Sequence, residues 1–160
     1  MDFYFAYGNN MSAQTMLDRI GLGHFHFLSL AKLEDFRLTF TTETPEWGGP
    51  VADLTPAEGD AVFGVLYQVD QVAWDQLEPH EPTYAKKQLS VSLISTCSSA
   101  VALHPKLQIG EAIEATVYFV PQQFKMPERP PAPEYLARVV SAATERGLPA
   151  DYIEHLMSYR

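Results

Sequence analysis

The feature that most constrains the fold is a succession of short strand-like segments between residues 24 and 119. HFHFLSLAKL, DFRLTF, VADLTP and AVFGVLYQV come first, and TYAKKQLSVSLI, a weaker candidate in AVALH, and EAIEATVYF follow. Strands at this spacing leave no room for the helical crossovers of βαβ units, so they favour a closed or nearly closed barrel.

Helices are predicted at both ends of this succession and once inside it. FYFAY, residues 3–7, is typical of a short buried strand, and Ser12 is a good N-cap for a helix over 13–20 that ends at Gly21. Asp70 is the expected cap of a short helix, VAWDQLE. The opening of the chain is therefore strand, tight turn and helix.

The C-terminal part predicts two more helices packed outside the barrel. PQQFKMPERPPAP, residues 121–133, contains five prolines and is expected to be a stiff, extended connection. EYLARVVSAATERG then shows one apolar face, Gly147 ends that helix, and Pro149 begins the last one. The sequence predicts an α+β protein with a single domain over residues 1–160.

Charge and cysteine content narrow the possible partners and compartment. The formal net charge is −9, from 20 acidic and 11 basic side chains, which argues against nucleic acid or an anionic membrane surface as a partner. Cys97 is the only cysteine and is expected to be a small, half-buried core residue. The start lacks a basic region followed by an apolar run, so we expect no signal peptide and a cytoplasmic location.

The first candidate site is FAYGNN, residues 5–10, where an apolar strand stops at a glycine just before a helix. N–H groups at a helix start have no partner within the helix, and a glycine lets a ligand approach the backbone closely. The turn is suited to holding a carboxylate or a developing oxyanion. An ordinary turn with nothing bound is the alternative.

The second candidate is LEPHEPTY, residues 77–84, in which Glu78 and Glu81 each precede a proline. Residues before proline avoid the helical region, so both glutamates are expected to be extended beyond the end of the helix. Such a stiff segment could direct a carboxylate into a cavity, where burial would suit it to proton transfer. Two solvated acids on a loop are the alternative.

Three weaker signals remain open. His24 and His26 would share one face of a strand, but no further ligand stands at a useful spacing, which favours a surface or interface role over a metal site. His80 is expected to be exposed unless it tunes Glu81. Trp47, followed by two glycines, would either line a pocket or pack in the core.

Taken together, these motifs resemble the γ-glutamylcyclotransferase (AIG2-like) family. FAYGNNM resembles its Tyr-Gly-Ser-Asn-Leu signature, and LEPHEPTY resembles its Leu-Asp-x-x-Glu-Gly segment with the tyrosine that follows. AKLEDFRLTF, EWGGPVADLTPAEGDAVFGVLY and the C-terminal APEYLARVVSAATERGLPADYIEHL resemble further stretches in the same order. The resemblance implies a small mixed β-barrel flanked by helices.

The resemblance also implies a reaction and its residues. In this family the free α-amine of a γ-glutamyl compound attacks its own γ-carbonyl, which gives 5-oxoproline and a released amine without a metal or organic cofactor. Glu81 matches the catalytic glutamate that carries the proton. The expected substrate-binding residues are Tyr7, Gly8, Asn9, Asn10, Met11 and Tyr84.

Departures from the family pattern leave the substrate open. Asn9 stands in place of serine, Glu78 in place of aspartate, Pro82 in place of glycine, and Phe124 where a tyrosine is common. The candidates are a cyclotransferase for γ-glutamyl amino acids or peptides, a relative acting on γ-glutamyl amines or a γ-glutamyl-protected biosynthetic intermediate, and a non-catalytic binding domain. The expected partner is a small γ-glutamyl compound, and a homodimer is a candidate assembly.

Overall fold

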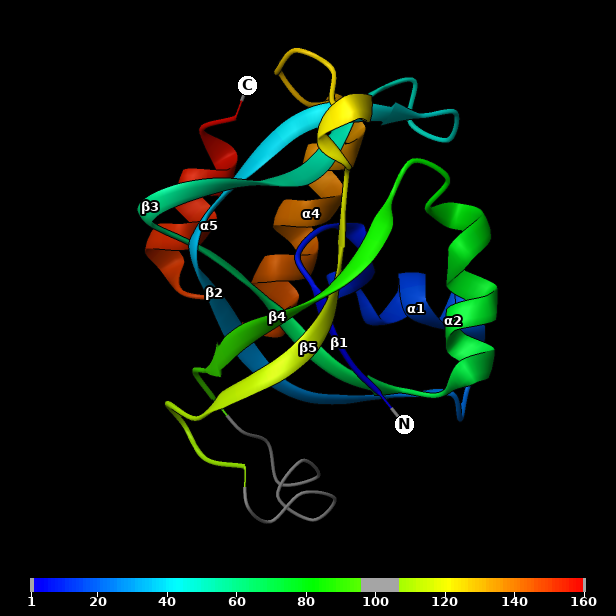
Figure 1. The fold of residues 1–160 in the computed structure, drawn as a ribbon, viewed down its shortest axis with the longest axis vertical. Helices are drawn as coiled ribbons and strands as arrows, with labels where there is room; N and C mark the ends of the chain where they lie inside the picture. Colours follow the sequence, from blue (N-terminus) through cyan, green and yellow to red (C-terminus); the bar gives the residue numbers. More distant parts are fainter. Residues whose placement is uncertain (1, 96–106, 160) are drawn as a thin grey trace.

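Five strands form the closed barrel at the centre of the molecule. The structure is a computed structural model and describes residues 2–95 and 107–159. The strand order is β1-β3-β2-β4-β5, and every neighbouring pair is antiparallel except β1 (Asp2–Ala6) with β5 (Ala112–Phe119), the parallel pair that closes the barrel. The predicted α+β class, with a small mixed barrel flanked by helices, is confirmed (Figure 1).

One long hairpin supplies two of these strands. β2 (Phe25–Thr44) and β3 (Gly49–Val69) pair along most of their length. The prediction of four shorter strands is wrong here, because the register shifts at a bulge around Asp35 instead of the strands ending. Asp35 has a φ of 64°, and its carboxylate accepts a hydrogen bond from the Gly59 N–H at 3.0 Å. A bulge bends a strand and increases its twist, so both strands continue around the barrel.

β4 (Ala85–Leu93) completes the barrel between β2 and β5. The expected strands TYAKKQLSVSLI and EAIEATVYF correspond to β4 and β5. The candidate strand AVALH and Cys97 lie outside the described residues.

The helix after β1 and the helix after β3 are capped by the residues that the sequence predicts. α1 (Ala13–Ile20) begins at Ser12, whose hydroxyl accepts the Thr15 N–H at 3.3 Å. α2 (Gln71–Leu77) begins at Asp70, whose carboxylate accepts an N–H of the first turn at 3.0 Å. Figure 1 shows α1 and α2 together on one side of the barrel.

The C-terminal helices cover another part of the barrel. α4 (Pro133–Arg146) ends at Gly147, which adopts the left-handed conformation, and α5 (Ala150–Met157) follows. In Figure 1, α5 lies on the side opposite to α2. Strands and helices of the described residues contribute to one hydrophobic cluster. No helix of the described residues combines the length and the apolar character needed to cross a membrane.

The segment between β1 and α1 is held in place by hydrogen bonds from Tyr67 and Arg146. It forms a short 3₁₀ helix, η1 (Asn9–Met11), instead of a simple turn. The Tyr67 hydroxyl hydrogen-bonds to the carbonyls of Asn10 and Met11 at 2.8 and 2.9 Å, and the Arg146 Nε donates to the Met11 carbonyl at 2.9 Å. Tyr67 and Arg146 thus satisfy the carbonyls of Asn10 and Met11. The side of η1 that faces away from them lines a cavity.

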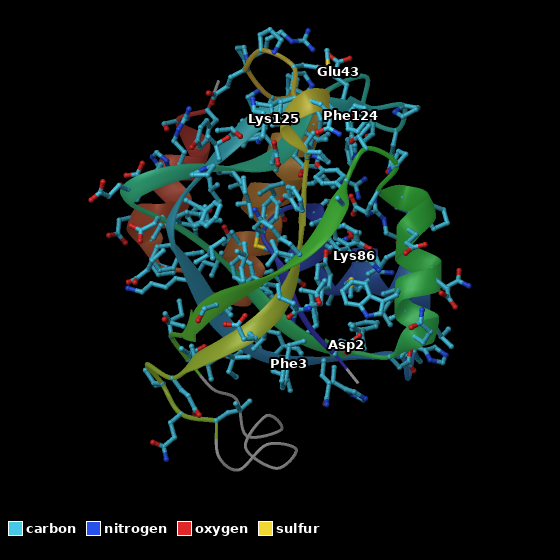
Figure 2. The ribbon with its side chains drawn as sticks, in the orientation of Figure 1. Asp2, Phe3, Glu43, Lys86, Phe124 and Lys125 are labelled. Carbon is cyan, nitrogen blue, oxygen red and sulfur yellow. The ribbon has the colours of Figure 1, made fainter. Side chains whose placement is uncertain are left out.

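The proline-rich connection follows the end of the barrel that carries the β2–β3 turn. It contains a short 3₁₀ helix, η3 (Gln122–Phe124), and is otherwise without regular structure. Its Lys125 pairs with the buried Asp53, and its Arg129 pairs with Glu43. Figure 2 shows Phe124 and Lys125 at the end of the molecule where Glu43 lies.

Candidate active site

A narrow cavity lies where η1 and the barrel meet the segment after α2. Its aromatic lining consists of Tyr4, Tyr7, Trp47, Tyr84, Tyr118 and Tyr135. Its other lining residues are Gly8, Asn9, Asn10, Arg19, Thr44, Glu46, Val51, Ala52, His80 and Glu81. The cavity measures about 50 Å³, whereas ligand pockets are commonly about 300–1,000 Å³. The cavity is therefore smaller than a typical ligand pocket.

Most of the predicted site residues lie in this cavity. FAYGNN and LEPHEPTY, which are about 70 residues apart in the sequence, face each other there through Asn10 and Glu81. The Asn10 Nδ2 donates to the Glu81 Oε1 at 3.1 Å and to the Tyr4 hydroxyl at 2.9 Å. The two motifs thus contribute adjoining walls of one site.

The Glu81 carboxyl is desolvated and only partly compensated by positive charge. Its side chain is 14% exposed, and the Arg19 guanidinium is 3.7 Å from its Oε1. Burial raises the pKa of Glu81 to about 7, although Arg19 and the Asn10 hydrogen bond act in the opposite direction. An acid with this pKa can both accept and release a proton near neutral pH.

Glu78 is positioned differently, and the expectation of an extended backbone there is wrong. It has φ −51° and ψ −42°, and it begins the 3₁₀ helix η2 (Glu78–His80) directly after α2. Its N–H continues the α2 pattern by bonding to Trp74, while Pro79 stands at the first helical positions, where no N–H is needed. The Glu78 carboxylate pairs on the surface with Lys86 at 3.2 Å.

Glu81 departs from the helix, at φ −127° and ψ 53°. This ψ lies outside the extended region, so the expectation of an extended backbone is wrong at Glu81 as well. Its N–H donates to the Glu78 carbonyl at 3.0 Å, and its carbonyl accepts from Tyr84 at 3.2 Å. These two bonds hold the turn that directs the Glu81 side chain inward while that of Glu78 remains outside.

The space beside Gly8, where a ligand was expected to approach the backbone, is filled by a tyrosine side chain. A Cβ on Gly8 would stand 2.6 Å from the Tyr135 hydroxyl. That hydroxyl accepts the Ala52 N–H at 3.2 Å, and the Asn9 N–H also hydrogen-bonds to it. Gly8 therefore admits the ring of Tyr135, from α4, to the cavity wall.

Two tyrosines of the wall are held by hydrogen bonds to backbone carbonyls. Tyr7 donates to the Tyr118 carbonyl at 2.7 Å, and Tyr84 donates to the Ala52 carbonyl. Burial raises the pKa of Tyr7 and of Tyr84 well above the usual range. Their hydroxyls consequently stay protonated and form a rigid, neutral wall.

Two hydroxyls of the lining have no partner among the described residues. They are Oη of Tyr118 and Oγ1 of Thr44, both buried. A buried polar group without a hydrogen bond is costly and uncommon in a native protein. At a cavity wall, such a group is suited to bind a ligand.

Met11, an expected substrate contact, and Phe124, a departure from the family pattern, lie away from the cavity. Met11 is fully buried and does not line it, and its N–H is bonded to the Gly8 carbonyl at 3.1 Å. Met11 packs into the core beneath the turn, so the expected substrate contact is not supported. Phe124 is also absent from the lining and is 62% exposed.

Of the weaker candidate residues, some line the cavity and others lie away from it. Trp47 lines the cavity, and His80 lies exposed at its mouth. His26 is exposed, while the His24 Nδ1 lies 2.8 Å from an Asp70 carboxylate oxygen. Within residues 2–95 and 107–159, no three His, Cys, Asp or Glu side chains form a group that could hold a metal ion.

Sequence reasoning missed several lining residues. Arg19 stands in the last turn of α1, where a basic residue is ordinarily a surface feature, and Tyr135 was assigned to the apolar face of its helix. Tyr118 and Thr44 reach the cavity only because the barrel closes. No local pattern distinguishes these residues, so only the tertiary structure identifies them.

Sequence comparisons match this chain to known proteins. The model of the AIG2-like family matches residues 61–156. A γ-glutamylcyclotransferase from Bos taurus is 31% identical over 163 residues, which cover 97% of this chain and 77% of the bovine protein.

Solved structures agree on the fold. A γ-glutamyl cyclotransferase superposes with a TM-score of 0.82 at 24% identity, over 99% of this chain and 88% of that protein. A yeast γ-glutamyl cyclotransferase described as specific to glutathione has a TM-score of 0.72 at 17% identity, over 99% of this chain and 94% of the yeast protein. At these identities the likeness supports the fold alone.

Proposed function

The chain belongs to the AIG2-like family and is an enzyme of the γ-glutamylcyclotransferase class, and from this premise we propose that it converts a γ-glutamyl compound into 5-oxoproline and a free amine. The observation that carries the proposal is Glu81, a carboxyl 14% exposed at the wall of a cavity, whose pKa is raised to about 7. This property matches the one proton carrier that the reaction needs.

In the proposed reaction the α-amine nitrogen attacks the γ-carbonyl carbon of the same molecule, and a C–N bond closes a five-membered ring. Ionised Glu81 takes the proton that the α-ammonium loses. It then gives a proton to the leaving nitrogen as the original amide C–N bond breaks. The ring nitrogen then loses its second proton to Glu81, which passes it to the released amine. The amine leaves as an ammonium and the Glu81 carboxylate is regenerated, so protons and bonds balance over the cycle.

Ring closure within one molecule requires little else from the protein. Nucleophile and carbonyl are already joined, so holding the γ-glutamyl group in a folded conformation supplies most of the advantage. The side chains suited to this are the neutral tyrosines of the wall and Asn10. The unpartnered hydroxyls of Tyr118 and Thr44 are available to accept or donate hydrogen bonds to the substrate.

The test is release of 5-oxoproline from a panel of γ-glutamyl compounds by the purified protein. The panel should contain γ-glutamyl amino acids, glutathione and γ-glutamyl amines without a carboxylate on the leaving group. We expect 5-oxoproline and the free amine in equal amounts from at least one member. If no member is turned over while several bind by calorimetry, the chain is a binding domain and the proposal is wrong.

A further inference from the structure

The cavity contains one nearly buried arginine that the proposed reaction does not use. The Arg19 side chain is 9% exposed. A charged side chain withdrawn from water must be paired, and each partner it loses is costly. The placement of its partners indicates what the arginine does.

Arg19 divides its two terminal nitrogens between the interior and the mouth of the cavity. NH1 donates to the Asn10 Oδ1 at 2.8 Å and lies 3.7 Å from the Glu81 Oε1. NH2 donates to the Glu46 Oε2 at 3.0 Å. Because a guanidinium is planar, a partner on NH2 also fixes the direction in which NH1 points.

Glu46 stands on the β2–β3 turn at residues 45–48, and its side chain is 49% exposed. It lines the mouth of the cavity but makes no direct contact with Glu81. Its carboxylate therefore acts on Glu81 without contact, by its negative charge and through Arg19.

The orientation of the Asn10 amide depends on the same pair. Arg19 has only donors, so the atom of Asn10 that faces it must be the oxygen. The Asn10 nitrogen is then directed to Glu81 and Tyr4. Without Arg19 in place, the amide could rotate and present its oxygen to the Glu81 carboxylate.

The positive charge of Arg19 and the negative charge of Glu46 nearly cancel near Glu81. Arg19 on α1 is positive and Glu46 on the β2–β3 turn is negative. His80 on η2 is exposed, and partial desolvation and the charge of Arg19 lower its pKa. The tyrosines that surround Glu81 are neutral. Glu46 thus offsets an arginine that would otherwise favour the ionised form of Glu81.

We propose that Glu46 is a positioning residue, which holds Arg19 in the cavity and through it sets the orientation of Asn10 and the charge around Glu81. The inference rests on the proposed function for its catalytic meaning, because Glu81 is the proton carrier there. It assigns to the β2–β3 turn a part in the chemistry without contact with the reacting atoms.

The experiment is a titration of Glu81 by NMR, with ¹³C-labelled glutamate carboxyls in the protein without substrate. The Glu81 signal is assigned by its loss in Glu81→Gln. We expect Glu46→Gln to move the midpoint to lower pH by about 0.5–1 unit, the size expected when one partly exposed charge is removed. Arg19→Gln should move it to higher pH.

Glu43→Gln is the matched control, since Glu43 lies on the same hairpin but pairs with Arg129 away from the cavity. It should leave the midpoint unchanged. Glu46→Asp keeps the charge and should restore most of the wild-type value. Because Glu46 is half exposed, its variants should remain folded even if Arg19→Gln does not.

The acid limb of the pH profile of kcat/KM should shift with the NMR midpoint in each variant. A folded Glu46→Gln protein with the wild-type midpoint would overturn the inference. Shifted midpoints in a protein that releases no 5-oxoproline would support the positioning role and count against the proposed function instead.

Discussion

Asp53 on β3 and Glu81 after α2 are both carboxylates withdrawn from solvent, but their partners differ. Asp53 is fully buried and accepts hydrogen bonds from Thr41, from the N–H groups of Leu54 and Val120, and from Lys125. Glu81 accepts one from Asn10, with Arg19 beyond hydrogen-bond distance.

This contrast separates a structural carboxylate from a candidate catalytic one. A carboxylate surrounded by donors joins the elements that supply those donors. In this protein Asp53 joins β2, β3 and the connection that carries Lys125. A carboxylate with few donors keeps a raised pKa and can exchange a proton. The same amide substitution at the two positions should therefore have opposite consequences.

The largest effect is expected from Glu81→Gln, which keeps the shape of the side chain but cannot carry a proton. The rate of 5-oxoproline release should fall about 10²–10⁴-fold, the usual range for a lost general acid–base group. Substrate binding, measured by calorimetry, should largely survive. Glu78→Gln is the control and should change the rate less than about threefold. If the two results were exchanged, the assignment of the motif would move three residues upstream.

Asp53→Asn should act on stability more than on turnover. The substitution leaves the Lys125 ammonium facing an amide, and breaking a buried ion pair commonly costs about 3–5 kcal/mol. We expect a loss of free energy of unfolding at the lower end of that range in urea denaturation, since Lys125 is 14% exposed and can turn toward solvent. The activity of the folded fraction should fall less than about tenfold. Wild-type stability would contradict a structural role for Asp53.

Glu81→Gln should also change the pH dependence of stability. The pKa of Glu81 is raised in the folded protein, from 4.5 to about 7, so ionising it destabilises the fold. This destabilisation is absent below pH 4.5, grows between pH 4.5 and 7, and is complete above pH 7. At pH 8 the variant should be about 1–3 kcal/mol more stable than wild type, and at pH 4 the two should be similar. Equal unfolding curves at both pH values would mean that Glu81 is not desolvated.

The smallest effect is expected from Phe124→Tyr. The resemblance to the family placed a missing tyrosine hydroxyl here, but Phe124 is 62% exposed and outside the lining of the cavity. The ratios of rates across the γ-glutamyl panel should be unchanged. A changed preference would mean that the connection after β5 reaches the leaving group.

Local chemistry explains what the sequence could predict. Ser12 and Asp70 cap their helices because cap chemistry is contained within four residues. Glu81 is singled out by its match to the family's catalytic glutamate, since Glu78 also precedes a proline. Arg19, Tyr118 and Thr44 escaped prediction because their neighbours in space are remote in sequence. The sequence did not predict that β2 and β3 are continuous, because the residues at the Asp35 bulge resemble those at the end of a strand.

The backbone of Glu78 shows a different limit. The preference of pre-proline residues for extended conformations is weak enough for the end of α2 to override it, because continuing into η2 retains the Glu78 hydrogen bond to Trp74. The adjoining helix thus decided the conformation of Glu78, and with it the contrast between Glu78 on the surface and Glu81 inside.

The pH dependence of kcat/KM for 5-oxoproline release tests the central claim most directly. Glu81 must be ionised to accept the first proton, so the rate should rise tenfold per pH unit on the acid side and level off near pH 7. That midpoint should coincide with the NMR titration of the Glu81 carboxyl. In Glu81→Gln the residual rate should lose this limb. An unchanged limb in Glu81→Gln, with turnover close to wild type, would contradict the account.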